Sequence, residues 1–176
     1  PQKLEEFEIF ALPGGWSFAD DIQAGRVLAN KFKFALREPL KKFIDSGKPV
    51  IGICNGFQVL VQLGALPGWG DWRERKITLM ANRSGKFEDR WIRLRTEACA
   101  CYFAQGMDST FTLPIRHGEG QLVFADKASF EKLANGRQIV FRYAGIDGMK
   151  SMSYPDNPNG SSDAIAGICN EAGNVL

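Results

Sequence analysis

The sequence predicts an α/β protein with a mainly parallel sheet that helices flank and short antiparallel strands extend. Three observations indicate this class. Strand-like, helix-like and strand-like segments alternate between residues 7 and 63, which is the pattern of βαβ units. Residues 50–53 form a short, apolar, β-branched run typical of a buried strand. Between residues 77 and 143, short strand-like runs instead follow one another with few helix-like segments between them.

Each element has its own signal. Residues 7–12 are strand-like and lead into a loop with paired glycines. Residues 20–43 carry apolar side chains at helical spacing, with a kink or break expected at Pro39. The strand at 50–53 is followed by a helix that Gly64 ends. Short alternating or apolar runs predict further strands, and one short amphipathic run predicts a helix at 129–134. The further strands are expected at residues 77–80, 90–94, 110–115, 121–125, 139–143 and 164–169. A tight turn is expected at residues 170–174, and residues 175–176 are expected to open another strand.

Length and composition limit the possible functions. A chain of 176 residues, 44% of them hydrophobic, suits a single domain over residues 1–176. A net charge of +2 argues against a nucleic-acid partner. No apolar run approaches the ~18 residues of a membrane span and no signal peptide is visible, so no membrane partner is expected. The scattered cysteines suggest no disulfide framework, which favours a cytoplasmic location.

Cys54 lies where the expected strand meets the next helix, within a G-x-C-x-G pattern at residues 52–56. The flanking glycines allow strand and helix to approach closely, and the sharp turn directs the side chain out of the sheet. The start of the helix offers free N–H groups and the positive end of the helix dipole, which favour negative charge. The pattern predicts a nucleophilic thiol, with a buried structural cysteine as the alternative.

His117, the only histidine, lies in an R-H-G-E-G segment with Glu119. A Cys–His pair with a carboxylate on the far imidazole nitrogen is a common way to activate a thiol. However, His117 and Glu119 are two residues apart, so on one strand they share a face, and nothing in the sequence brings either to Cys54. The residues alone leave three roles for His117: general base, binding-loop residue and structural residue.

No metal site is predicted. Cys99 and Cys101 resemble half of a metal site, but neither a second pair nor a suitable histidine accompanies them.

Several segments together resemble the glutaminase component of phosphoribosylformylglycinamidine synthase, which is a class I, triad-type glutamine amidotransferase with a flavodoxin-like core. The similar segments are residues 12–21, 52–58, 82–91, 116–120 and 154–161. The cysteine pattern indicates the class, and the R-H-G-E-G and Y-P-D-N-P-N-G-S segments are more specific for the purine enzyme. The resemblance runs in order over essentially the whole chain.

The resemblance implies a glutaminase mechanism. Cys54 would attack the side-chain amide of L-glutamine, form a γ-glutamyl thioester and release ammonia. The backbone N–H groups of Gly15 and Asn55 match the family's oxyanion hole.

The resemblance also implies where the substrate binds. Gln58 matches a position in the glutamine pocket, and the loop from Ser84 to Phe87 would contact the substrate's α-amino and carboxylate groups. His117 and Glu119 match a family motif other than the catalytic pair, so they are expected in the pocket or at a partner interface.

The partners follow from the same resemblance. Ammonia would pass to a large synthetase subunit, with a small accessory subunit as a further partner, in de novo purine biosynthesis. There ATP and magnesium would activate formylglycinamide ribonucleotide, and ammonia would convert it to formylglycinamidine ribonucleotide. No cofactor is expected in this subunit itself.

The resemblance further leads us to expect that the chain is truncated at both ends. The family's triad histidine and glutamate lie in a P-H-P-E segment that follows a strand such as residues 173–176, so they are expected after Leu176. A first strand and helix are expected before Pro1. This chain alone is therefore expected to hydrolyse little glutamine.

Two other functions fit the residues. A thiol hydrolase of the dienelactone-hydrolase kind would use the same turn at Cys54 on a different substrate. A non-catalytic docking module of the synthetase would instead use exposed surfaces such as residues 69–73, where Trp69 and Trp72 are expected to be exposed.

Overall fold

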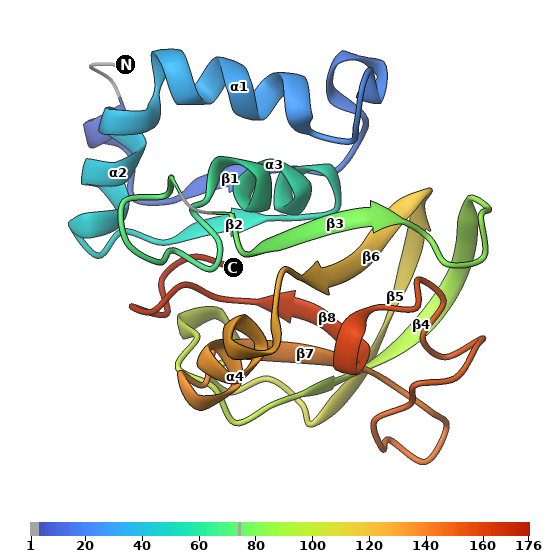
Figure 1. The fold of residues 1–176 in the computed structure, drawn as a ribbon. Coiled ribbons are helices and arrows are strands. Elements are labelled where there is room, and N and C mark those ends of the chain that lie inside the picture. Colours follow the sequence, from blue (N-terminus) through green and yellow to red (C-terminus); the bar gives the residue numbers. More distant parts are fainter. Residues whose placement is uncertain (1–3, 74) are drawn as a thin grey trace. The chain divides into compact units, whose positions relative to one another are not determined.

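The computed structural model describes residues 4–73 and 75–176, and the chain divides into two compact units. The first unit contains the chain up to Arg75, together with Cys101–Phe103 and Cys169–Leu176 (Figure 1). The second contains Lys76–Ala100 and Ala104–Ile168. Pro1, before which a further strand and helix were expected, lies outside the described residues. That residues 1–176 form one amidotransferase domain stays a prediction.

The first unit combines helices with a short parallel sheet. Its elements are η1 (Leu4–Glu6), β1 (Phe10–Leu12), η2 (Ser17–Asp20), α1 (Arg26–Ala35), α2 (Arg37–Asp45), β2 (Val50–Gly52) and α3 (Asn55–Leu63). Strand β1 pairs with β2 in parallel, with Ala11 opposite Ile51. On its other side β2 meets the end of the chain, since Val50 forms a parallel bridge with Val175. The strand-like character predicted for residues 175–176 is thus confirmed, with β2 at the centre of the sheet.

Buried amide side chains hold the last residues against β2. Asn174 donates from Nδ2 to the carbonyl oxygens of Ile44 and Lys48 at 2.8 and 3.0 Å. The side-chain oxygen of Asn170 accepts from the backbone N–H of Val175 at 3.0 Å. Because buried polar groups need partners, these bonds fix the turn expected at residues 170–174.

The expected helix break at Pro39 is wrong. Helix α1 ends and α2 begins at Leu36, whose φ of −129° and ψ of 0° are not helical. Pro39 is the third residue of α2, where a backbone N–H would have no acceptor within the helix. A proline there removes no hydrogen bond, so it is compatible with the first helical turn.

The loop after α3 also differs from the prediction. Trp72 is buried, with only 6% of its surface exposed. Gly64 ends α3 with φ +89°, and a Cβ at Gly64 would lie 2.5 Å from the Trp72 carbonyl oxygen. The chain therefore folds back on the end of the helix, and the expected exposure of Trp72 is wrong.

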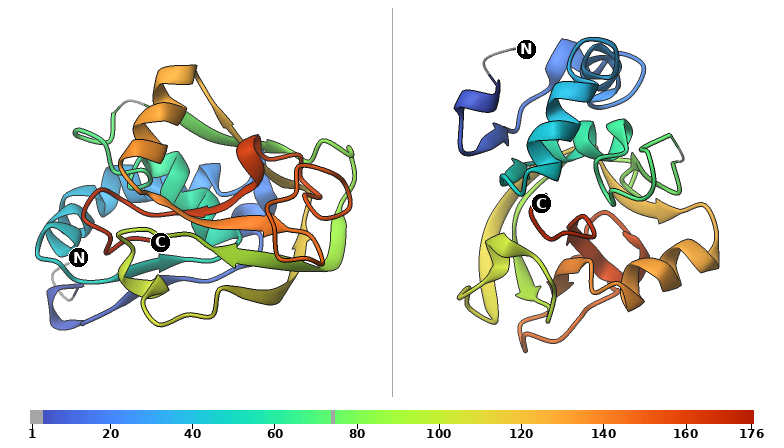
Figure 2. Two further views of the ribbon diagram at one scale, coloured as in Figure 1. Left: turned by 90° about the horizontal axis from the view of Figure 1, so that it is seen from below. Right: turned by 90° about the vertical axis from the view of Figure 1, so that its left-hand side faces the viewer.

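The second unit is built from antiparallel strands. Its elements are β3 (Ile77–Ala81), β4 (Glu88–Thr96), β5 (Thr110–His117), β6 (Glu119–Phe124), α4 (Lys127–Asn135), β7 (Ile139–Ala144), η4 (Ser162–Ala164) and β8 (Ile165–Ile168). The short turn η3 (Tyr102–Ala104) belongs to the first unit except for its last residue. One sheet has the order β5-β4-β7-β8, and β3 pairs with β6 (Figure 2). Short connections suit antiparallel pairing, because parallel pairing requires a longer crossover. The α/β class and the additional antiparallel strands are confirmed.

Two features stabilise this unit. Ile92, Leu94 and Tyr143 are buried together in its core, against partly buried Phe111 and Phe141. Asp126 caps the start of α4, because its carboxylate accepts a hydrogen bond from the backbone N–H of Ser129 at 2.7 Å.

In the first unit, α3 packs so closely on the strands that only glycine fits at two positions. A Cβ at Gly52 would lie 2.6 Å from Cδ1 of Leu60, and a Cβ at Gly56 would lie 2.0 Å from the carbonyl oxygen of Leu12. Leu60 itself is fully buried. These contacts fix how α3 starts relative to β1 and β2.

Replacing Gly56 by alanine should therefore lower the free energy of unfolding by about 3 kcal/mol, because the new methyl group would push α3 away from β1. Urea denaturation measures this loss. Gly118→Ala is the matched control, since a Cβ at Gly118 meets no atom within 4 Å. Equal stabilities of the two variants would contradict the close packing.

Candidate active site

Cys54 occupies a strained position between β2 and α3. Its φ of +52° and ψ of −107° are rarely adopted by a side-chain-bearing residue, and its thiol is free and half-buried. Flanking hydrogen bonds hold this conformation: Gly56 N–H donates to the Ile53 carbonyl at 3.0 Å, and Gln58 N–H to the Cys54 carbonyl at 3.0 Å. Such strain persists only where the surrounding structure determines it, and it is typical of the nucleophile elbow.

The loop after β1 runs directly past this cysteine. A Cβ at Gly14 would lie 3.3 Å from the Cβ of Cys54, and Ile53 N–H donates to the Leu12 carbonyl at 3.0 Å. Gly15 follows with φ +133°, a conformation that favours glycine. A Cβ at Gly15 would meet no atom within 4 Å, so its backbone conformation, rather than crowding, requires glycine here.

The next residues form a left-handed turn. Phe18, Ala19 and Asp20 have φ values of +55°, +57° and +51°, although none is glycine. Each such residue is disfavoured by about 1–2 kcal/mol relative to right-handed backbone. Interactions elsewhere must therefore hold the turn.

The side chain of Asn55, the first residue of α3, provides such interactions. Its Oδ1 accepts from the backbone N–H of Ser17 at 3.1 Å. Its Nδ2 donates to Asp20 Oδ1 at 2.9 Å and to Gln58 Oε1 at 3.0 Å. Sequence reasoning used only the backbone N–H of Asn55 and missed the side chain, because its partners in the loop lie 35 or more residues away.

The structure thus brings Cys54, Gly15 and Asn55 together around one turn and buries Gln58 beneath it. Gln58 is 5% exposed and its carbonyl oxygen is engaged with Asn55. The first N–H groups of a helix have no acceptor within the helix, so the Asn55 N–H is available to an oxygen of a bound reactant. A thiol beside such donors can attack a carbonyl carbon while the donors stabilise the developing oxyanion.

The remaining predicted residues, Ser84, Phe87, His117 and Glu119, lie in the second unit. Ser84 Oγ donates to the buried carboxylate of Glu88 at 2.7 Å. The ring of Phe87 is 64% exposed. Glu119 begins β6 and is half-buried.

His117 is packed against backbone. It lies opposite Glu88 in the β4–β5 register. A Cβ at Gly120 would lie 2.2 Å from Cε1 of the imidazole, and the buried Nδ1 has no hydrogen-bond partner among the described residues. Burial lowers the pKa of His117 below its usual value, and the nearby Glu88 carboxylate partly opposes that shift.

Three of the segments that carry the family resemblance meet around this histidine. Asn82 Nδ2 donates to the His117 carbonyl at 2.8 Å, and Arg83 N–H donates to the Asn159 carbonyl at 3.0 Å. Ser161 Oγ donates to the Gly120 carbonyl at 3.0 Å. Asn82, Asn159 and Ser161 are buried, and sequence reasoning did not single them out because only the fold brings them together.

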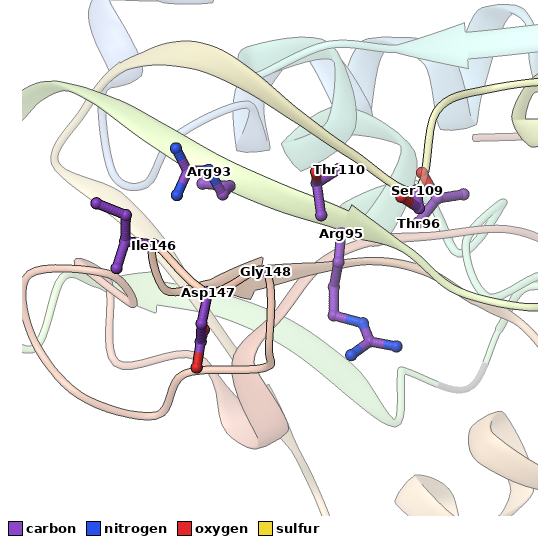
Figure 3. A pocket seen from close by; sticks show the side chains of 8 residues that line it. All are labelled: Arg93, Arg95, Thr96, Ser109, Thr110, Ile146, Asp147 and Gly148. Carbon is purple, nitrogen blue, oxygen red and sulfur yellow. The ribbon is translucent and has the colours of Figure 1, made fainter.

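A separate polar pocket of about 560 Å³ lies in the second unit (Figure 3). Its lining residues are Arg93, Arg95, Thr96, Ser109, Thr110, Ile146, Asp147 and Gly148. It contains none of the residues predicted for the site.

In residues 4–73 and 75–176, no group of three or more histidine, cysteine, aspartate or glutamate side chains could hold a metal ion. Across the same residues, none of the helices has the length and apolar character needed to cross a membrane.

Comparison with protein families supports this geometry. The model of the CobB/CobQ-like glutamine amidotransferase domain matches residues 1–176. The chain belongs to this family.

Curated relatives show which members of the family this chain is similar to. This amidotransferase chain is 42% identical to the phosphoribosylformylglycinamidine synthase subunit PurQ of Methanococcus maripaludis strain C7, over 99% of this chain and 64% of the relative. It is 44% identical to the subunit of the same name from Dehalococcoides mccartyi, over 100% of this chain and 67% of the relative. The chain thus spans about two thirds of the length of these relatives. The predicted resemblance to the glutaminase component is confirmed.

A solved structure confirms the fold. The amidotransferase chain matches a chain in the structure of PurLQS from Thermotoga maritima with a TM-score of 0.71 and 32% identity. The match covers 97% of this chain and 66% of the other.

Burial of His117 should lower its pKa, and because His117 is the only histidine in the sequence, this pKa can be measured directly. NMR titration of the single imidazole should give a pKa below about 6.5 in the folded protein. Because the unfolded chain then binds the proton more tightly, stability should fall as the pH drops through about 6.5 towards the folded pKa. His117→Gln should remove this part of the pH dependence. A folded pKa above 6.5 would contradict the burial.

Proposed function

We propose that the protein that contains these 176 residues hydrolyses L-glutamine at Cys54 and supplies ammonia to a synthetase, whereas residues 1–176 alone hydrolyse little glutamine. The sulfur of Cys54 forms a bond to the amide carbon, and the carbon–nitrogen bond then breaks. Ammonia leaves with a proton from a general acid, and the γ-glutamyl group remains on sulfur. Water cleaves the thioester to give glutamate and free thiol. A general base takes the proton of the Cys54 thiol, and the same group can return a proton to the leaving ammonia as a general acid.

The conformation of Cys54 beside the Gly15 loop is the observation that carries this proposal. A residue at φ +52° and ψ −107° directs its side chain out of the sheet while its neighbour Asn55 opens α3. The Gly15 N–H comes from the loop whose preceding residue, Gly14, lies against Cys54. Two backbone donors on either side of one thiol suit the oxyanion that forms when a thiolate attacks an amide.

The contacts also refine the roles of the substrate-binding residues. Gln58 contributes to the glutamine pocket with a side chain already oriented by Asn55. The Ser84 hydroxyl donates its hydrogen bond to Glu88. Contact of the Ser84–Phe87 loop with the substrate's α-amino and carboxylate groups stays an implication of the resemblance. His117 and Glu119 support the pocket or a partner interface and take no part in proton transfer.

The relatives' name supports the proposed partner. They are called subunits of phosphoribosylformylglycinamidine synthase. We infer a large synthetase subunit, with a small accessory subunit as a further partner, in cytoplasmic purine biosynthesis. Formylglycinamide ribonucleotide, ATP and magnesium bind to the synthetase, and this subunit uses no cofactor.

A glutamine-mimicking diazoketone should label Cys54 rapidly, and L-glutamine should protect against it, because the reagent needs the glutamine pocket as well as the thiol. Peptide mapping by mass spectrometry locates the label. Cys99, which is also half-buried, provides an internal control and should stay unlabelled. Cys54→Ser should abolish labelling.

The other outcomes have defined meanings. Labelling of Cys54 that glutamine does not slow would favour a thiol hydrolase with another substrate. Copurification with a synthetase and no labelling would favour a docking module. Either result would contradict the proposed glutaminase.

A further inference from the structure

We propose that the Asn55 side chain is a positioning residue that sets the oxyanion hole by tying the loop after β1 to the start of α3. This inference rests on the proposed glutaminase function. Asn55 then has two roles in the site. Its backbone N–H contacts the oxyanion, and its side chain holds the other donor, Gly15 N–H, in place.

The Asn55 amide is fully engaged across the loop. It is 4% exposed, accepts from Ser17 N–H and donates both its protons, one to Asp20 and one to Gln58. The partners fix the amide orientation, since Ser17 N–H requires an acceptor and the Asp20 carboxylate requires a donor. Asp20 Oδ1 also accepts from Gly25 N–H at 3.3 Å, which connects the turn to the start of α1.

The left-handed turn makes this side chain necessary. Phe18, Ala19 and Asp20 all have positive φ, which L-residues disfavour, so the turn would relax without outside support. Asn55 contacts both ends of the turn, at Ser17 and at Asp20.

Gly15 depends on the same support. A Cβ at Gly15 would meet no atom within 4 Å, so packing around a side chain does not hold this residue. The loop is instead fixed on either side, by Gly14 against Cys54 and by Ser17 on Asn55. Loss of the second attachment would let the Gly15 N–H turn away from the oxyanion.

Asn55→Asp tests this directly. The change keeps the acceptor for Ser17 but places a carboxylate oxygen against Asp20. With the full chain in complex with its synthetase, kcat for glutamine hydrolysis should fall about 10²-fold, with a much smaller change in KM, because the donor is misplaced by about 1 Å. Adding Asp20→Asn restores a donor–acceptor pair between the two positions and should recover part of the loss.

Two further measurements separate positioning from general damage. Alkylation of Cys54 by iodoacetamide displaces iodide without forming an oxyanion. In Asn55→Asp its rate should therefore fall far less than kcat, and only as far as the new carboxylate disfavours the thiolate. Amide hydrogen exchange of residues 14–21 should rise about 10-fold as the loop loosens. Asp126→Ala, which removes the cap of α4 in the second unit, is the control. It should lower the melting temperature but change neither kcat nor hydrogen exchange in the loop.

Each outcome is decisive. Unchanged exchange in the loop, or alkylation that falls in parallel with kcat, would overturn the positioning role, because Asn55 would then support only the elbow. A parent protein that does not hydrolyse glutamine would overturn the proposed function, and the exchange data would still show separately whether Asn55 holds the loop.

Discussion

The close contact of α3 with β1 is the constraint on which the first unit depends. The Leu12 carbonyl oxygen would lie 2.0 Å from any Cβ at position 56, so α3 can start this close to β1 only because residue 56 is glycine. That position forces the chain to turn sharply after β2, and Cys54 takes up the turn at φ +52°. The same contact brings Leu12, and with it the following glycine loop, beside the cysteine. A packing requirement of the core thus fixes the strained backbone of Cys54 and the closeness of the glycine loop to it.

The two segments beside Cys54 are held in different ways: α3 by apolar packing, and the loop at Gly15 by polar contacts. Helix α3 is part of the core, with Val59 and Leu60 fully buried. The loop at Gly15 has no such packing and is held by polar contacts to Asn55. Electrostatic stabilisation of an oxyanion depends on donors that are already in position before the reaction. The buried amide of Asn55 therefore provides for the loop what apolar packing provides for the helix.

Local signals in the sequence were sufficient for the strand–cysteine–helix turn, because glycine spacing and β-branched runs report directly on backbone geometry. They also indicated the turn at residues 170–174 and most strands of the second unit. They failed at two places for different reasons. Pro39 fits the first turn of α2, so the two helices separate at Leu36 instead, and Trp72 is buried because the chain folds back on Gly64. The networks of Asn55 and of His117 join residues far apart in the chain, so no local pattern could reveal them.

If Cys54 attacks glutamine, a γ-glutamyl thioester forms on its sulfur, and this covalent intermediate can be isolated. The full chain, mixed with L-glutamine and quenched in acid after milliseconds to seconds, should yield one modified peptide. That peptide should contain Cys54 and carry a γ-glutamyl group that hydroxylamine removes, as expected of a thioester. The Cys54→Ala protein should yield none. Glutamine consumption with no acyl group on Cys54, or with the group on Cys99, would contradict the account.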